Sequence, residues 1–193
     1  MKAIVAHVYI EWIHPFGDGN GRTGCLIEFK ILLSAGVPIV AAYLLSNHYN
    51  QTRTEYYRHL DESHKSGGNV IPFIRYAVQG FVDGLVSQIE MVQAQQIYVH
   101  WVNYIHDVFR DKNSTTQIRR RRLAIDLIGQ KNDILLSKVR HITPRIAEAY
   151  ANKTVKTLQR DVNALEELGL IVRTSTGIRP NNSFMSAFIS PSC

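Results

Sequence analysis

The sequence of 193 residues has few cysteines and no long apolar run. Its two cysteines, Cys25 and Cys193, give no disulfide framework, and no stretch is long and apolar enough to suggest a membrane span. The N-terminus lacks a signal-peptide pattern, and there is no internal repeat or low-complexity tract. We therefore expect a cytoplasmic globular protein. Secreted disulfide scaffolds and membrane proteins are excluded.

The histidines show no metal-ligand spacing. His7 and His14 can share one helix face, but no further ligand set accompanies them, and we do not expect a zinc site. Hydrophobic residues make up 45% of the chain and charged residues 20%, which is ordinary for a globular protein of one or two domains.

Charge is distributed unevenly along the chain. Residues 111–193 hold 14 Lys/Arg against 7 Asp/Glu, a net charge of +7, whereas residues 1–110 hold 8 against 9, a net charge of −1. The polar stretch 111–116 separates the two segments. We therefore predict one domain over residues 1–110 and a second over 111–193, and the basic second segment suggests an anionic partner.

The richest chemistry lies in nine consecutive residues. They are His14, Pro15, Phe16, Gly17, Asp18, Gly19, Asn20, Gly21 and Arg22. An amphipathic helix is predicted to follow, which places the glycines at a helix N-terminus, where free backbone N–H groups bind anions. We expect Phe16 to be buried and to anchor the loop.

Each polar side chain of this segment has a chemical role open to it. Asp18 is a hard oxygen ligand for Mg²⁺, and Arg22 on the first helical turn can bind a phosphate. An imidazole changes charge near neutral pH, so His14 can accept a proton from an attacking hydroxyl. Together these groups indicate nucleotidyl or phosphoryl transfer. The alternative is a Gly/Asn-rich turn between two helices.

The segment HPFGDGNGR resembles the signature of Fic (Fido) domains, HPFx(D/E)GNGRxxR, and matches it at every fixed position through Arg22. Flanking similarity extends over about residues 3–90. The resemblance implies an all-helical domain that transfers AMP from ATP to a protein Ser, Thr or Tyr hydroxyl. It implies that His14 is the base and that Asp18 holds Mg²⁺. It also implies ATP-phosphate binding by four further residues: Gly19, Asn20, Gly21 and Arg22.

Two departures from the family pattern stand beside this match. Cys25 occupies the position of the second signature arginine, and a plain substitution is favoured over a catalytic thiol. The family also has helices and a β-hairpin flap ahead of the motif, so we expect the C-terminal part of a longer Fic protein. An inactive remnant, or an enzyme that transfers UMP or phosphocholine, therefore stays open as an alternative.

The hydrophobic periodicity predicts a mainly α-helical chain. Helices are expected at 3–12, 22–35, 46–63, 71–109 (long or broken), 118–128, 144–150 and about 152–168, then a strand at 170–172 and a hairpin tip at 176–182. The fold class expected is therefore a partial all-helical Fic domain followed by a small α+β winged helix-turn-helix domain.

The second domain resembles bacterial winged-helix regulators in the segment KTLQRDVNALEELGLIVR. A winged helix there predicts binding of double-stranded DNA, or else packing or dimerisation, so a homodimer is a further partner considered. An apolar face of the helix is expected to hold Val155, Leu158, Val162, Leu165 and Leu168. The run Arg119–Arg122 is interpreted as a solvated face. The residues predicted to contact DNA are Lys153, Thr154, Lys156, Thr157, Arg160 and Arg179.

Overall fold

The computed structural model describes residues 1–130, 132–181 and 183. The chain is mainly helical with one two-stranded sheet, which confirms the expected fold class. It divides into two compact units, an N-terminal unit over Met1–Glu90 and a C-terminal unit from Met91 onward. No helix of the described residues is long and apolar enough to cross a membrane.

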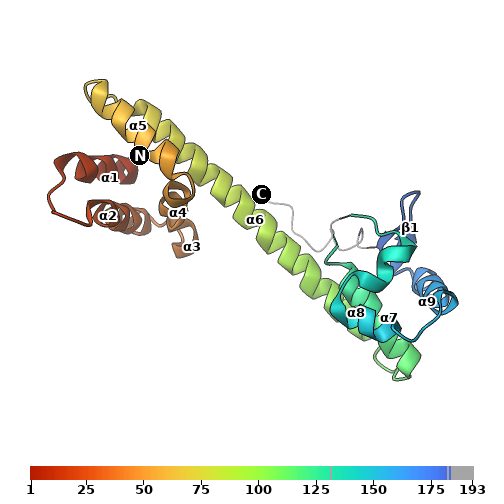
Figure 1. Ribbon diagram of the computed structural model, residues 1–193. Coiled ribbons are helices and arrows are strands. Elements are labelled where there is room, and N and C mark those ends of the chain that lie inside the picture. Colours follow the sequence, from red (N-terminus) through yellow and green to blue (C-terminus); the bar gives the residue numbers. More distant parts are fainter. Residues whose placement is uncertain (131, 182, 184–193) are drawn as a thin grey trace. The chain divides into compact units, whose positions relative to one another are not determined.

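The N-terminal unit is built from short helices and the first part of a long one (Figure 1). They are α1 (Lys2–Ile13), α2 (Asn20–Ser34), α3 (Ile39–Ala42), α4 (Leu44–Gln51), α5 (Arg53–Lys65) and α6 (Ile71–Val108). Helices α1 and α2 lie side by side. The single helix expected over 46–63 is wrong, because the backbone leaves the helical region at Thr52.

The core of this unit is rich in aromatic rings. Its buried members are Ile4, Val8, Leu45, Tyr49, Tyr56, Phe73, Ile74 and Ala77. Two fully buried polar side chains, His7 and Glu28, lie among these rings. A buried polar group is costly unless it is hydrogen-bonded, so the hydroxyls of the core tyrosines are important partners.

The C-terminal unit contains the rest of α6 and a small α+β assembly. It comprises α7 (Thr115–Leu127), η1 (Leu136–His141), α8 (Pro144–Tyr150), α9 (Val155–Glu167), β1 (Ile171–Arg173) and β2 (Ile178–Pro180). The strands pair antiparallel, and Ile134 forms a further bridge to Ile178. Hydroxyls of Ser114, Thr143 and Thr154 cap α7, α8 and α9 by accepting backbone N–H bonds.

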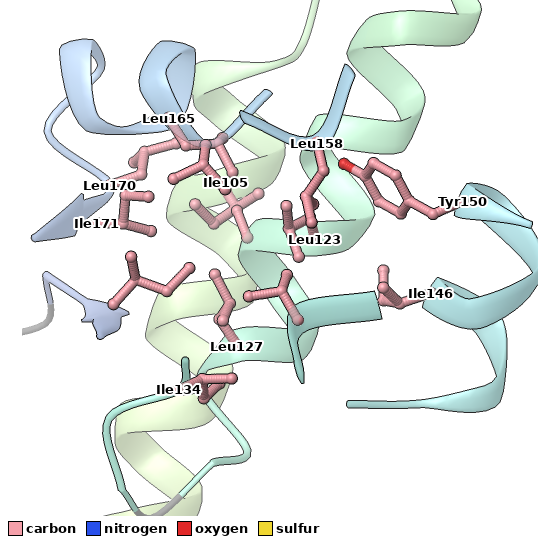
Figure 2. Close-up of a cluster of buried hydrophobic side chains, with 14 of the residues drawn as sticks. Ile105, Leu123, Leu127, Ile134, Ile146, Tyr150, Leu158, Leu165, Leu170 and Ile171 are labelled. Atoms are coloured by element: carbon pink, nitrogen blue, oxygen red, sulfur yellow. The ribbon is translucent and has the colours of Figure 1, made fainter. Parts of the chain in front are cut away.

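The core of the C-terminal unit is a continuous cluster of aliphatic and aromatic side chains. Figure 2 shows members from α6, α7, α8, α9 and β1 converging on one another. Trp101 and Ile105 of α6, and Phe109 just after its end, are fully buried in this cluster. The packing of the C-terminal unit therefore begins within α6, ahead of the polar stretch 111–116.

Three local predictions in this unit are wrong. Residues 178–180, which were expected to lie in a hairpin tip at 176–182, form β2 instead, because Ile178 is buried and pairs with Ile134. Asn182 of the expected tip lies outside the described residues. Val155 and Leu168, expected on the apolar face of α9, are 66% and 38% exposed. They lie at the first position and just past the last position of α9, at the margins of its packed face.

The arginine run 119–122 is also not simply solvated. Arg119 is buried, and its Nε donates to Asp161 Oδ2 at 2.7 Å, while Arg120 Nε donates to Asp161 Oδ1 at 2.8 Å. Tyr150 donates its hydroxyl to the same carboxylate at 3.0 Å. Asp161 therefore joins α7, α8 and α9 through a saturated buried ion network.

Candidate active site

The motif loop is held by backbone conformation and by one side chain. Helix α1 ends at His14, whose φ of 49° is left-handed, and α2 begins after Gly19, whose φ is 87°. The Asn20 side chain accepts from the Phe16 N–H at 2.9 Å and donates to the Phe16 carbonyl at 2.6 Å. These contacts fix a tight turn that presents the N-terminus of α2.

The loop forms one side of a pocket of about 710 Å³. The pocket lies wholly in the N-terminal unit and brings together every motif residue predicted to act. Its lining includes His14, Asp18, Gly19, Asn20, Gly21 and Arg22, together with Glu11, Gly17, Cys25, Ser46, Tyr49, Asn50, Arg53, Tyr56 and Tyr57. The first N–H groups of a helix have no intrahelical partner, so the N-terminus of α2 supplies donors for an anion there.

Asp18 and Arg22 are paired with each other. Arg22 donates to Asp18 Oδ2 at 3.0 Å, and the two side chains are 81% and 92% exposed respectively. Such an exposed pair is weak and can be exchanged for ligand contacts. A carboxylate beside a phosphate site fits Mg²⁺, which takes one or two carboxylates together with phosphate oxygens. Among the described residues, no three His, Cys, Asp or Glu side chains form a metal cluster.

One expectation for the loop needs correction. Phe16 is 50% exposed rather than buried, since the loop is anchored by the Asn20 amide and not by an aromatic side chain. Asn20 itself is buried, with 3% exposure, and its side-chain amide is used in the two hydrogen bonds to Phe16. Asn20 therefore offers a ligand its backbone N–H.

Beyond the motif, the pocket is lined by Glu11, which was not predicted from the sequence, and by residues of the segment 47–57. The family resemblance implied that this segment borders the adenine side of the site, but it assigned no single residue there. Glu11 lies one helical turn before His14, and this spacing is a signal that was available. Asn50 and Arg53 come from the end of α4 and the start of α5 and give no comparable signal. Tyr49 and Tyr56 are buried core residues that also line the pocket.

A buried polar network supports these tyrosines from behind. The Tyr56 hydroxyl lies 2.8 Å from His7 Nε2, and Tyr49 donates to Glu28 Oε1 at 3.0 Å. Burial lowers the pKa of His7 to about 4 and raises the pKa of Glu28 to about 7. Both groups are therefore held toward their neutral forms, in which hydrogen bonding and not charge fixes the rings.

Cys25 is the position at which the chain departs from the family signature. Burial, with the nearby carboxylates of Glu28 and Glu11, raises the pKa of its thiol to about 11. A thiol with a raised pKa is a poor nucleophile near neutral pH, which disfavours a catalytic thiol. The pocket wall at Cys25 is accordingly neutral.

The residues predicted to contact DNA lie at the surface of the C-terminal unit. Lys153 and Thr154 precede α9, while Lys156 and Arg160 lie on it, and all four are exposed. Thr157 is partly buried, and its backbone N–H is capped by Thr154. Arg179 is exposed on β2.

Comparison with known proteins agrees with the motif. The model of the Fic/DOC family matches residues 1–32. The protein adenylyltransferase Fic of Nematostella vectensis is 38% identical over 77 residues, which cover 40% of this chain and 16% of that protein. The protein adenylyltransferase fic-1 of Caenorhabditis elegans is 36% identical over 78 residues, 40% of this chain and 14% of that protein.

A third relative, the protein adenylyltransferase Fic of Aedes aegypti, is 38% identical over 74 residues, 38% of this chain and 13% of that protein. The matches thus span about one sixth or less of these relatives. No solved structure matches the chain. The motif and these matches agree, and the N-terminal part of the chain is similar to the Fic/DOC family.

Proposed function

We propose that the pocket of the N-terminal unit transfers AMP from ATP to the hydroxyl of a protein side chain. The observation that carries this proposal is the gathering of His14, Asp18 and the N-terminus of α2 around one pocket. The names of the three relatives, all protein adenylyltransferases, supply the transferred group and the substrates.

In this proposal the N–H groups at the start of α2 and Arg22 hold the phosphates of ATP. Asp18 binds Mg²⁺, which neutralises phosphate charge when it is present. His14 takes the proton of the target hydroxyl while the hydroxyl oxygen attacks the α-phosphorus of ATP. The bond from the α-phosphorus to the bridging oxygen breaks, and pyrophosphate leaves.

The test is transfer of label from α-labelled ATP to protein, with and without Mg²⁺. His14→Ala should reduce the transfer by at least about 100-fold, the usual size of general-base catalysis. His141→Ala, a histidine change in the other unit, is the matched control and should leave transfer unchanged. Label that is indifferent to His14, or no label with any target, would reject the proposal.

A second candidate function rests on the C-terminal unit. Three helices followed by an antiparallel pair of strands are the order of a winged helix, and the exposed basic residues lie around the capped start of α9. We propose that this unit binds double-stranded DNA, with Lys153, Lys156 and Arg160 on the phosphates and bases. Arg179 on β2 would contact the backbone.

Fluorescence anisotropy with a labelled DNA duplex tests this second function. The triple variant Lys153→Ala, Lys156→Ala, Arg160→Ala should weaken binding and lower the slope of log affinity against log salt by about three, one for each phosphate contact. Its matched control removes three exposed charges of the N-terminal unit: Lys2, Lys30 and Arg75. An equal loss of DNA affinity in both triple variants would show that the DNA is attracted by net charge alone, and would contradict a binding surface at α9.

A further inference from the structure

Glu11 is an acidic residue in a pocket built to receive anions. It lies on the last turn of α1 and lines the pocket together with His14, Gly21 and Cys25. Its Oε1 atom is buried and has no hydrogen-bond partner. A Cβ added to Gly21 would stand 3.2 Å from this oxygen, so the carboxyl group rests against the second residue of α2.

At this position an ionised Glu11 carboxylate would repel a bound phosphate. A phosphate bound at the N-terminus of α2 would approach Gly21 from the pocket, next to Glu11 Oε1. Two neighbouring anions repel each other, which raises the pKa of the carboxyl group and favours its protonated form. A protonated carboxyl group, in contrast, donates a hydrogen bond to a phosphate oxygen.

The surroundings of Glu11 offer little to keep it ionised. The titratable groups of the pocket are His14 from α1, Asp18 from the loop, Arg22 and Cys25 from α2, Tyr49 from α4, and Arg53, Tyr56 and Tyr57 from α5. Arg22 is paired with Asp18 in the free pocket and is assigned to the phosphates when they bind, and the Cys25 thiol is neutral. Burial raises the pKa of Glu11, and His14 and the Tyr56 hydroxyl only partly oppose that shift.

We propose that Glu11 is a nucleotide-binding residue that becomes protonated when the phosphates bind and donates the resulting O–H to a phosphate oxygen. The proton comes from the solvent, and no covalent bond of the nucleotide changes. The inference rests on the proposed nucleotide function of the pocket. It adds a proton to the binding equilibrium, so affinity falls by up to tenfold per pH unit above the pKa of the free carboxyl group.

Calorimetry with a non-hydrolysable α,β-methylene analogue of ATP and excess Mg²⁺ measures this proton directly. Titrations of the full chain in buffers of different ionisation enthalpy give the number of protons taken up. The wild-type chain should take up about one proton more than Glu11→Gln, whose amide cannot titrate. Cys25→Ala, which leaves the pocket wall neutral, should keep the wild-type uptake.

Cys25→Arg provides a second variant that does not alter Glu11. A guanidinium beside the carboxylate keeps it ionised, so binding should continue with the extra proton lost. If the wild-type chain binds the analogue with the same proton uptake as Glu11→Gln or Cys25→Arg, the role proposed for Glu11 is wrong, while the proposed nucleotide function stands. No binding of the analogue by the wild-type chain would overturn both this inference and the proposed function.

Discussion

The two units differ in how far their buried polar groups are paired. Among the described residues, six side chains of the N-terminal unit keep a buried atom without a hydrogen-bond partner, against two in the C-terminal unit, Gln117 and Arg140. In the C-terminal unit the buried Asp161 carboxylate is saturated by Arg119, Arg120 and Tyr150. In the N-terminal unit His7, Glu11 and Glu28 each keep a buried atom without a hydrogen-bond partner. A saturated network rigidifies a core, whereas buried groups left partly unpaired are costly and concentrate at functional sites.

The difference indicates where the two units carry their function. The N-terminal unit places its polar groups around and beneath a pocket, which is where the proposed transfer would take place. The C-terminal unit uses its buried charges for structure and leaves a different set of cations exposed around α9. Each unit contains one of the two tryptophans, Trp12 and Trp101, so the unfolding of each can be followed in a variant that lacks the other.

The largest expected effect is in the C-terminal unit. Asp161→Asn removes the charge that compensates two arginines and should lower the free energy of unfolding of this unit by about 3–5 kcal/mol. Urea unfolding followed by Trp101, in a Trp12→Phe background, measures it. Glu166 lies on the same helix as Asp161, and Glu166→Gln, which breaks its exposed pair with Arg173 of β1, should cost less than about 1 kcal/mol. Similar losses in both variants would contradict the special role of Asp161.

The next prediction concerns the pH dependence of the N-terminal unit. The raised pKa of Glu28, about 7 against 4.5, gives stability that is full below pH 4.5 and is lost as pH rises to about 7. The lowered pKa of His7, about 4 against 6.5, gives stability that is full above pH 6.5 and is lost as pH falls to about 4. The two contributions oppose each other over the shared range.

Single substitutions should separate these opposed slopes. Between pH 4.5 and 6.5, Glu28→Gln removes the larger of the glutamate contributions that oppose His7, and stability should rise with pH by up to about 1.4 kcal/mol per unit. His7→Gln should reverse the sign of this slope. Unfolding followed by Trp12 at several pH values, in a Trp101→Phe background, measures both. Parallel curves for the two variants would refute the opposed pair.

The sequence predicted which motif residues gather at one site better than it predicted their setting. Local patterns fixed most helices and the position of the glycine loop, because caps and turns depend on neighbouring residues. The role of Asn20 in holding Phe16 and the pairing of Asp18 with Arg22 depend on side-chain geometry within the loop. The burial of Arg119 depends on Asp161, which lies 42 residues away, and no local pattern contains that distance.

A smaller effect than that of Asp161→Asn is expected from a glycine that lies against the N-terminal core. A Cβ on Gly80 of α6 would stand 2.2 Å from the His48 ring, which packs against Tyr76. Gly80→Ala should therefore destabilise the N-terminal unit by about 1–3 kcal/mol through overpacking. In Gly129→Ala the nearest atom is 3.8 Å away, and no such loss is expected. Unfolding midpoints of the two variants decide whether α6 is packed this closely.

The measurement that tests the central claim most directly is nucleotide-dependent unfolding of the full chain. With Trp12 as the reporter in a Trp101→Phe background, Mg–ATP should raise the midpoint of the N-terminal unit, because a ligand stabilises the unit that binds it. With Trp101 as the reporter in a Trp12→Phe background, the direct shift should be absent or smaller. No shift at Trp12, or a larger shift at Trp101, would contradict a nucleotide site in the pocket beside α2.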